Sequence, residues 1–317
     1  MNSNIITVIT INPCPLPGLT EMRKSMNESL TRSNFGFIGL GLIGGSVARC
    51  IRAAMPEAEI TAYNYHKSKS HPRLELALSD GVLSGITSNL EDFSECDVIF
   101  LCAPVLTNIT YLKELAPYLK KGCILTDVGS VKGQIYRAVQ EEGLEDYFIG
   151  GHPMAGTEKI GYEHSFAGLL EDCYYILTPT SRIAAADIKW MQDFVTDIIH
   201  AKCVTIDVDE HDQATAGISH APHIVSAALV NAVHARDHKG IYQLLAAGGF
   251  KDITRISSSS PEMWQNICLS NKDAVLGFLE EYMQILTDAK RQIEEEDAEG
   301  ILHFFAEAKT YRDQLLR

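Results

Sequence analysis

The stretch Phe35–Ser46, which reads FGFIGLGLIGGS, is the part of this chain from which the rest is most readily interpreted. It opens with an apolar run that is too short for a helix but rich enough in aromatic and branched residues for a buried strand. Three glycines follow at the G-x-G-x-x-G spacing, and the next segment, SVARCIRAAM, carries apolar residues at helical intervals. A strand, a glycine turn and a helix in this order predict a dinucleotide-binding unit.

Each residue of the turn has an expected role. Gly39 would permit the tight turn, Gly41 would let the backbone approach a pyrophosphate, and Gly44 would let the helix pack closely on the strand. Leu42 and Ile43 lie at the start of the helix, where free N–H groups face phosphates. Glycine-rich turns also occur in sheets that bind no nucleotide, so the flanking strand and helix are what favour dinucleotide binding here.

The composition excludes some classes of partner. Of the 317 residues, 46% are hydrophobic and 21% are charged, which is typical of a globular protein with room for two domains. The 27 basic and 41 acidic residues give a formal charge of -14, which argues against nucleic acid or an anionic membrane as the main partner. An anionic substrate would therefore require Arg, Lys and His side chains gathered in one pocket.

The cysteines and the apolar runs favour a cytoplasmic protein. The eight cysteines include no C-x-x-C pair and no Cys/His cluster at zinc spacing, so free thiols in a reducing compartment are expected. No apolar run approaches the length of a membrane span, so no membrane partner is expected.

Residues 34–208 are expected to form an α/β, Rossmann-like nucleotide-binding domain. Short apolar runs alternate there with helical stretches, as they do in βαβ units, and this pattern predicts a mostly parallel sheet. Ligands bind at the carboxyl ends of the strands in such sheets, so Ala103 and Pro104 are expected beside the cofactor. The expected strands after the first are 59–64, 96–104, 122–130, 147–153, 173–179 and 202–208.

The two ends of the chain depart from this pattern. Residues 1–33 look like neither a packed domain nor a signal peptide, and we expect a poorly ordered leader. Residues 209–317 lack strand signals and predict an all-α helical domain, in which a first helix is kinked at Pro222. Segments 272–297 and 298–317 are amphipathic and carry i,i+4 charge pairs. Long helices of this kind often dimerise, so we expect a homodimer through the C-terminal helices.

The end of the second strand bears on the choice of nicotinamide cofactor. An acidic residue there accepts from the ribose 2′-OH of NAD, whereas basic residues accommodate the 2′-phosphate of NADP. This chain has Asn64 at that position, followed by His66, Lys67 and Lys69. An amide can bond a hydroxyl without repelling a phosphate, and the basic residues are equally compatible with a solvated loop. The expected cofactor is therefore NAD or NADP.

Four further motifs follow predicted strands or lie in the helical half: DVGSVK (127–132), GHPMAGTE (151–158), SHAPH (219–223) and FKDITR (250–255). Each alone has an ordinary explanation. Ser130 could cap a helix, and Lys251 and Arg255 could be surface charges. His220 and His223 are one turn apart, but no carboxylate pattern completes a metal site, so no metal is expected. Together the motifs offer a base for a hydroxyl proton and cations for an anionic substrate.

The glycine loop and these motifs, in this order, resemble the prephenate dehydrogenase family of tyrosine biosynthesis. GHPMAG and SH-x-PH are more selective than the glycine loop, and the resemblance covers Asn34 to the C-terminus. It implies a Rossmann-like domain followed by a helical dimerisation domain. It also implies oxidative decarboxylation of prephenate to 4-hydroxyphenylpyruvate, with NAD or NADP accepting the hydride. No length remains for a regulatory ACT domain, so feedback inhibition by tyrosine through such a domain is not expected.

The resemblance also implies roles for individual residues. His152 would be the catalytic histidine that accepts the proton of the ring hydroxyl, and Ser130 would bond the same hydroxyl and help orient that histidine. Arg255 would bind a substrate carboxylate, whose geometry suits a bidentate guanidinium group. The family often has an acidic residue at the position of Asn64, so the resemblance does not decide between NAD and NADP. The remaining substrate-site residues that it implies are His220, Lys251 and Glu158.

One alternative remains open at the level of sequence, and two others are disfavoured. Arogenate dehydrogenase acts on a substrate that shares the hydroxyl and carboxylate of prephenate, so these residues do not separate the two activities. The β-hydroxyacid dehydrogenases share the domain layout but use a lysine base in the helical domain, whereas this chain places His152 at a strand end. A dinucleotide-sensing regulator without turnover would need no function at His152, Ser130 and Arg255, and all three positions carry suitable residues.

Overall fold

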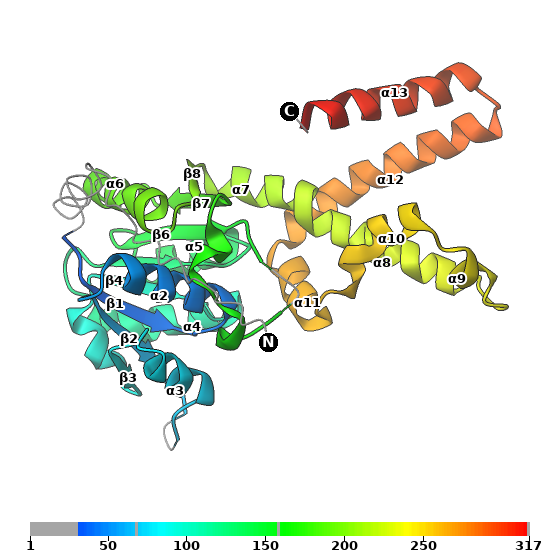
Figure 1. Cartoon of the computed structure of the whole chain (residues 1–317). Helices are drawn as coiled ribbons and strands as arrows, with labels where there is room; N and C mark the ends of the chain where they lie inside the picture. The colour runs from blue at the N-terminus through cyan, green and yellow to red at the C-terminus, as the bar shows by residue number, and fades with distance from the viewer. Residues whose placement is uncertain (1–30, 67–68, 157–158, 316–317) are drawn as a thin grey trace, which may run out of the picture.

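The computed structural model describes residues 31–66, 69–156 and 159–315, and its nucleotide-binding half is built on one sheet (Figure 1). The described strands run in the order β3-β2-β1-β4-β5-β6-β7-β8. All neighbouring strands pair in parallel except β6 and β7, which pair antiparallel. The strands are β1 (Asn34–Ile38), β2 (Glu59–Tyr63), β3 (Gly85–Thr87), β4 (Val98–Leu101), β5 (Ile124–Asp127), β6 (Phe148–Pro153), β7 (Tyr174–Pro179) and β8 (Lys202–Thr205).

The sheet confirms the predicted Rossmann-like class. Because β1 to β6 are parallel, their carboxyl ends lie along one edge, and the loops that follow them carry the predicted motifs. At this edge β6 ends at Pro153, which pairs with Tyr175 near the start of β7. The fold therefore brings the glycine turn, the DVGSVK loop and the GHPMAG segment (151–156) to the same edge of the sheet.

Helices cover both faces of the sheet because its central strands are apolar on both. Every residue of β4 and β5 is buried. On one face Phe37 and Phe100 stack with their ring centroids 5.0 Å apart, in a core that includes α2 (Leu42–Ala54) and α6 (Ala185–Asp193). On the other face Ile99 and Leu125 belong to a core shared with α4 (Val105–Leu115) and α5 (Gly133–Glu141).

The strand predictions needed correction in two respects. β3 was not predicted, because its three half-buried residues are too few to show an alternating pattern. Three strands, β4, β5 and β8, end at Leu101, Asp127 and Thr205, each three residues before its predicted end. Ser130 therefore lies in the loop that follows β5. The next helix, α5, begins at Gly133 and has Lys132 at its N-cap position, so Ser130 does not cap it.

The chain just before β1 packs against the nucleotide-binding half. Arg32, which was predicted to belong to the leader, forms an ion pair with Asp187. Its guanidinium group also lies over the Trp190 ring, 5.0 Å from the centroid. Residues 1–30 of the predicted leader lie outside the described residues.

The second half confirms the predicted helical class. In Figure 1, α12 and α13 form a hairpin that projects away from the sheet. None of the described helices is both long and apolar enough to cross a membrane. The helices are α7 (Val208–Thr215), α8 (Ala221–His234), α9 (Ile241–Leu245), α10 (Gly248–Thr254), α11 (Pro261–Ser270), α12 (Lys272–Glu294) and α13 (Ala298–Leu315).

The irregularity predicted at Pro222 takes the form of a π-helical turn. Residues Ala216–His220 form this turn between α7 and α8, and Pro222 falls in the first turn of α8. A proline lacks the backbone N–H and clashes with the carbonyl four residues earlier in a regular helix. The wider π turn relieves this conflict, and such turns are frequent at functional sites. The SHAPH motif lies across this junction.

Candidate active site

The glycine turn after β1 has the geometry that its sequence predicts. Gly39 has a φ of 86°, and a Cβ at this position would lie 2.7 Å from the Ala103 nitrogen. A Cβ on Gly44 would lie 2.9 Å from the Cys102 side chain, so neither position accepts a larger residue without strain. A Cβ on Gly41 would meet nothing within 4 Å. Gly41 therefore faces open space, as a backbone that approaches a pyrophosphate should.

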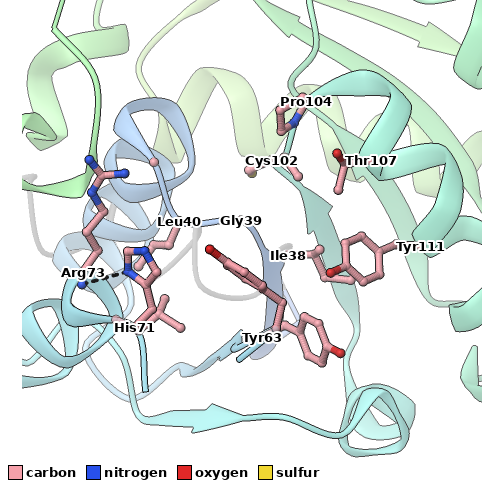
Figure 2. Close-up of a pocket in the computed structure, with 14 residues that line it drawn as sticks. Ile38, Gly39, Leu40, Tyr63, His71, Arg73, Cys102, Pro104, Thr107 and Tyr111 are labelled. Atoms are coloured by element: carbon pink, nitrogen blue, oxygen red, sulfur yellow. Dashed lines mark hydrogen bonds between the residues drawn. The ribbon is translucent and has the colours of Figure 1, made fainter. Parts of the chain in front are cut away.

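A cavity of about 360 Å³ opens beside this turn and fits the requirements of a dinucleotide site. Figure 2 shows His71 and Arg73 on one side of the turn and Pro104, Thr107 and Tyr111 on the other. Four of the predicted cofactor residues line the cavity, namely Gly39, Gly41, Ala103 and Pro104. The others at the turn, Leu42, Ile43 and Gly44, form the first turn of α2, where free N–H groups can face phosphates.

Asn64 lies at the predicted position but does not line this cavity. Its side-chain amide donates to the carbonyl of His66 at 2.6 Å and to that of Lys69 at 3.3 Å, and the residue is buried. Asn64 therefore organises the loop after β2. Near the end of β2 the cavity is lined instead by Tyr65, His71 and Arg73. The Arg73 guanidinium group forms a 3.0 Å ion pair with Glu163.

A second cavity, of about 340 Å³, lies between the two halves of the chain. Ser130 lines it from the loop after β5, and α11 lines it from the helical half through residues such as Met263 and Asn266. Ala103 and Pro104 line both cavities, so the two adjoin along the loop after β4. A substrate in the second cavity would lie next to a cofactor in the first.

His152 lies near the end of β6 and is almost buried, with 8% of its surface exposed. Its Nδ1 atom is 2.8 Å from Nε2 of His211, and Nδ1 of His211 is 2.8 Å from Oδ1 of Asp212. Burial, and then the neighbouring His211, Lys132 and His220, hold the pKa of His152 well below its ordinary value. His152 is therefore neutral at pH 7, which is the form that can accept a proton.

A buried ion pair ties the Ser130 loop to the strand that carries His152. Lys132 contacts Asp127 and also donates to the carbonyl of Gly151 at 2.8 Å. Asp127 accepts from the N–H groups of Gly151 at 3.1 Å and Gly129 at 2.9 Å. Burial lowers the pKa of Lys132, and the neighbouring Asp127 opposes this effect. These bonds hold Gly129 and Lys132, which flank Ser130 in the loop, and Gly151, which precedes His152, in one group.

The two histidines of SHAPH have different surroundings. His220 is buried and lies 3.1 Å from the Asn271 amide through Nδ1, while its Nε2 has no hydrogen-bond partner among the described residues. Burial lowers its pKa to about 4. His223 is half-buried, stacks on Trp264 with ring centroids 3.6 Å apart, and contacts the Ser219 carbonyl through Nδ1 at 2.8 Å.

The predicted substrate cations lie in the helical half. Lys251 lies on α10, and Arg255 is the first residue after that helix. Both residues are exposed, and in the described part of the chain neither forms an ion pair. Burial lowers the pKa of His223, and the charge of Arg255 also lowers it. Glu158, the remaining predicted substrate residue, lies outside the described residues.

Several residues of the site were not predicted. His211 contacts His152 although 59 positions separate the two histidines, and Asp212 contacts His211. Trp264 and Asn271 join the SHAPH segment from α11 and its C-terminus. The adjacent pair His211-Asp212 at the start of the helical half was the one sequence signal for these residues. The same pair is equally compatible with a solvated helix.

Comparison with known proteins agrees with this geometry. The family model for the prephenate dehydrogenase nucleotide-binding domain matches residues 47–204, and that for the prephenate dehydrogenase dimerization domain matches residues 207–307. The prephenate dehydrogenase of Bacillus subtilis is 36% identical over 282 residues, which cover 87% of this chain and 74% of the relative. The chain belongs to the prephenate dehydrogenase family. It is accordingly an NAD(P)-dependent dehydrogenase.

Solved structures of similar proteins support this membership. The prephenate dehydrogenase of A. aeolicus, in complex with hydroxyphenyl propionate and NAD+, has 32% identity and a TM-score of 0.81 over 90% of this chain and 99% of its own. Synechocystis arogenate dehydrogenase has 29% identity and a TM-score of 0.79 over 89% of this chain and 99% of its own. Both prephenate and arogenate dehydrogenases are thus close in structure to this chain.

Proposed function

We propose that this protein converts prephenate to 4-hydroxyphenylpyruvate with NAD or NADP as oxidant, as a step in tyrosine biosynthesis. The observation that carries the proposal is the state of His152. It lies at the edge of the sheet that bears the glycine turn, it is neutral, and its Nδ1 atom is occupied by His211. Residues 34–208 would bind the cofactor, and residues 209–317 would complete the substrate site and contact a second copy.

The reaction requires deprotonation and alignment of the substrate. Nε2 of His152 would take the proton from the ring hydroxyl, while the Ser130 hydroxyl group would bond the same oxygen. When bound, the nicotinamide supplies the hydride acceptor. Loss of the ring carboxylate as carbon dioxide then makes the ring aromatic, which drives the step strongly forward. The enzyme therefore has to position the hydroxyl between His152 and Ser130.

Binding of an anionic substrate requires local cations in a chain whose formal charge is -14. Arg255 would bind a carboxylate, and Lys251 would add positive charge one helical turn away. His220 and Glu158 would complete the polar lining of the substrate site; Nε2 of His220 has no hydrogen-bond partner among the described residues. A buried polar atom without a partner is unfavourable, so a substrate group that bonded His220 would remove that penalty.

One assay separates the candidate activities. Purified protein is mixed with prephenate or arogenate, each with NAD or NADP, and the absorbance of reduced nicotinamide is followed. We expect reduction with prephenate; reduction with arogenate alone would favour the activity of the Synechocystis relative. The same assay identifies the cofactor. His71 and Arg73, rather than Asn64, face the first cavity, so a 2′-phosphate would meet a cation there. No reduction with any pair would leave a dinucleotide-binding regulator.

Replacing Arg255 with glutamine is expected to raise the KM for prephenate about 10- to 100-fold, which corresponds to the loss of one charge-assisted hydrogen-bonded contact. kcat should change little, because the carboxylate is bound equally in the ground state and the transition state. Steady-state kinetics measure both quantities. Arg182→Gln, which alters an exposed arginine of the nucleotide-binding half, is the control. An unchanged KM would show that another residue binds the carboxylate.

We further propose that two copies associate through the C-terminal helices. One protomer leaves large apolar side chains exposed on α9, α12 and α13, among them Leu244 at 81%, Leu302 at 71% and Phe305 at 66%. α9, α10 and α13 bury no residue of their own. Exposed large apolar side chains in such number are often covered by a partner, and the dimerization family model matches this half of the chain.

The double variant Leu302→Glu/Phe305→Glu is expected to shift the protein from dimer to monomer. Each buried apolar side chain is worth about 1.5–3 kcal/mol, so four substitutions per dimer weaken association by many orders of magnitude. Light scattering coupled to gel filtration measures the mass. Leu76→Glu, at an exposed leucine of the nucleotide-binding helix α3 (Pro72–Ser79), is the matched control. A double variant that stayed dimeric would place the interface elsewhere.

The cysteines support a place in the cytoplasm, which we also propose. All seven cysteines in the described part of the chain are unpaired. Burial raises the pKa values of most of them, for example to about 12 for Cys96 and Cys123, so these thiols are unreactive. Unpaired, inert thiols are typical of proteins that work in a reducing compartment.

A further inference from the structure

His152 is the end of a line of three buried side chains that crosses from one half of the molecule to the other. His211 and Asp212 belong to α7, at the start of the helical half, and His152 belongs to β6. The two contacts in the line, His152 Nδ1 to His211 Nε2 and His211 Nδ1 to Asp212 Oδ1, both measure 2.8 Å. The His211 side chain is fully buried, and that of Asp212 is 12% exposed. In the proposed function His211 only occupies Nδ1 of His152, and Asp212 has no role.

The Asp212 carboxylate determines which nitrogen of each histidine in this line carries a proton. Burial would raise the pKa of Asp212, but the hydrogen bonds from His211, Lys132 and Gly133 hold it below its ordinary value. An ionised carboxylate only accepts, so Nδ1 of His211 carries a proton and its Nε2 is bare when the ring is neutral. That bare nitrogen accepts from Nδ1 of His152. The Nε2 atom of His152 is then left with a free lone pair.

The surroundings of His152 show why a positive charge on this residue needs a nearby carboxylate. A proton on this histidine creates a buried cation, and the groups that face it are mostly basic. They are His211 and Asp212 from α7, Lys132 with its partner Asp127 from β5 and the following loop, and His220 from the π turn. Since Asp127 already offsets Lys132, Asp212 is the carboxylate available to a charge that arises on the histidines.

We propose that His211 and Asp212 are positioning residues that set the tautomer of His152 and take up the charge it acquires. The inference rests on the proposed function, in which His152 is the base. One proton passes from the substrate hydroxyl to Nε2 of His152, and the Nδ1 proton of His152 passes to Nε2 of His211. His152 ends neutral, and the positive charge lies on His211 against Asp212. The hydride leaves the substrate with its electron pair for the nicotinamide.

Asp212 could instead have a purely structural role. Its carboxylate accepts from the N–H groups of Lys132 at 2.9 Å and Gly133 at 2.7 Å, and so joins the helical half to the start of α5. Such a joint stabilises the fold without influencing proton transfer. The experiment must therefore use readouts that a loss of stability alone does not change.

The variants His211→Gln and Asp212→Asn separate these readings. Glutamine can accept from His152 near the position of Nε2, but it cannot take up a proton. We expect kcat to fall at least about tenfold in each variant, within the contribution of general base catalysis, with KM within about twofold of wild type. The matched controls are His200→Asn, at an exposed histidine, and Asp209→Asn, at an exposed aspartate on α7. Both controls should retain wild-type kinetics.

The pH profile gives a second readout. Removing the charge of Asp212 makes a cation on the histidines harder to form. The acid limb of kcat/KM should therefore move to lower pH while the plateau falls. A structural joint alone would leave the limb in place, and that outcome would refute the relay. Wild-type kcat in both variants would refute it equally.

A measurement on the unaltered protein keeps the inference testable even if His211→Gln or Asp212→Asn fails to fold. Nitrogen NMR of protein labelled at its histidines distinguishes the two neutral tautomers, and the His152 signals are identified by their absence in His152→Asn. We expect the Nδ1–H tautomer; an Nε2–H tautomer would overturn the inference. If His152→Asn is itself active, the proposed function fails. If only the His211 and Asp212 variants are normal, the relay alone fails.

Discussion

Replacing His152 with asparagine is expected to lower kcat by about 10²- to 10⁴-fold, the range that a positioned general base contributes. Asparagine can still donate to His211 from near the position of Nδ1, but it has no atom in place of Nε2 to take the substrate proton. KM should change little, because the base acts only as the hydroxyl loses its proton. Steady-state kinetics with prephenate measure both values. His200→Asn, at an exposed histidine, is the matched control.

The same residue governs the response to pH. The pKa of His152 lies well below its ordinary value because the ring is buried. The neutral base therefore persists as pH falls through the range in which an ordinary histidine becomes charged. We expect kcat/KM to stay level near pH 6.5 and to decline only at lower pH. Turnover near normal in His152→Asn, or an acid limb above pH 6.5, would contradict the assignment of His152 as the base.

Replacing Lys132 with methionine is expected to reduce the free energy of unfolding by about 3–5 kcal/mol, the penalty for breaking a buried ion pair. The side chains of Lys132 and Asp127 are 1% and 0% exposed, so water cannot replace the missing partner. For a domain of this size the loss corresponds to a decrease in Tm of roughly 6–20 °C. Calorimetry or thermal circular dichroism measures it.

A second variant tests the physical reason for this loss. Asp127→Asn/Lys132→Met removes both charges, so the double variant should recover part of the stability that the single variant loses. A double variant less stable than Lys132→Met would instead attribute the loss to the hydrogen bonds of Asp127 with Gly129 and Gly151. A single variant that melted with the wild type would show that the pair contributes nothing.

The parts of the site that sequence predicted are those governed by local backbone rules. Gly39 needs a positive φ and Gly41 needs open space, and both requirements follow from the G-x-G-x-x-G spacing itself. Strand β4 was found for a similar reason, although it ends at Leu101 rather than at the predicted Pro104. It is a continuous apolar run, and a run of that kind indicates a strand buried on both faces.

The residues that sequence missed or misplaced depend on neighbours distant in the chain. Asn64 follows β2 as predicted, but its side chain does not line the cavity. Its amide donates instead to the carbonyls of His66 and Lys69 in the loop after β2. The antiparallel pairing of β7 was not predicted, because direction is decided by how the chain crosses the sheet. The three residues of β3 form a strand only beside β2.

The glycine turn, the order of strands and helices and the cluster of chemically suitable motifs were determined by the sequence alone. Spacing along the chain sets these features, because turn geometry and apolar periodicity are properties of consecutive residues. The surroundings of His152 were determined by the tertiary structure. Packing α7 against the end of β6 brings His211 within 2.8 Å of His152, and burial keeps the pKa of His152 low. Burial and hydrogen bonding between distant segments exist only in the folded chain, and they keep the His152 ring neutral.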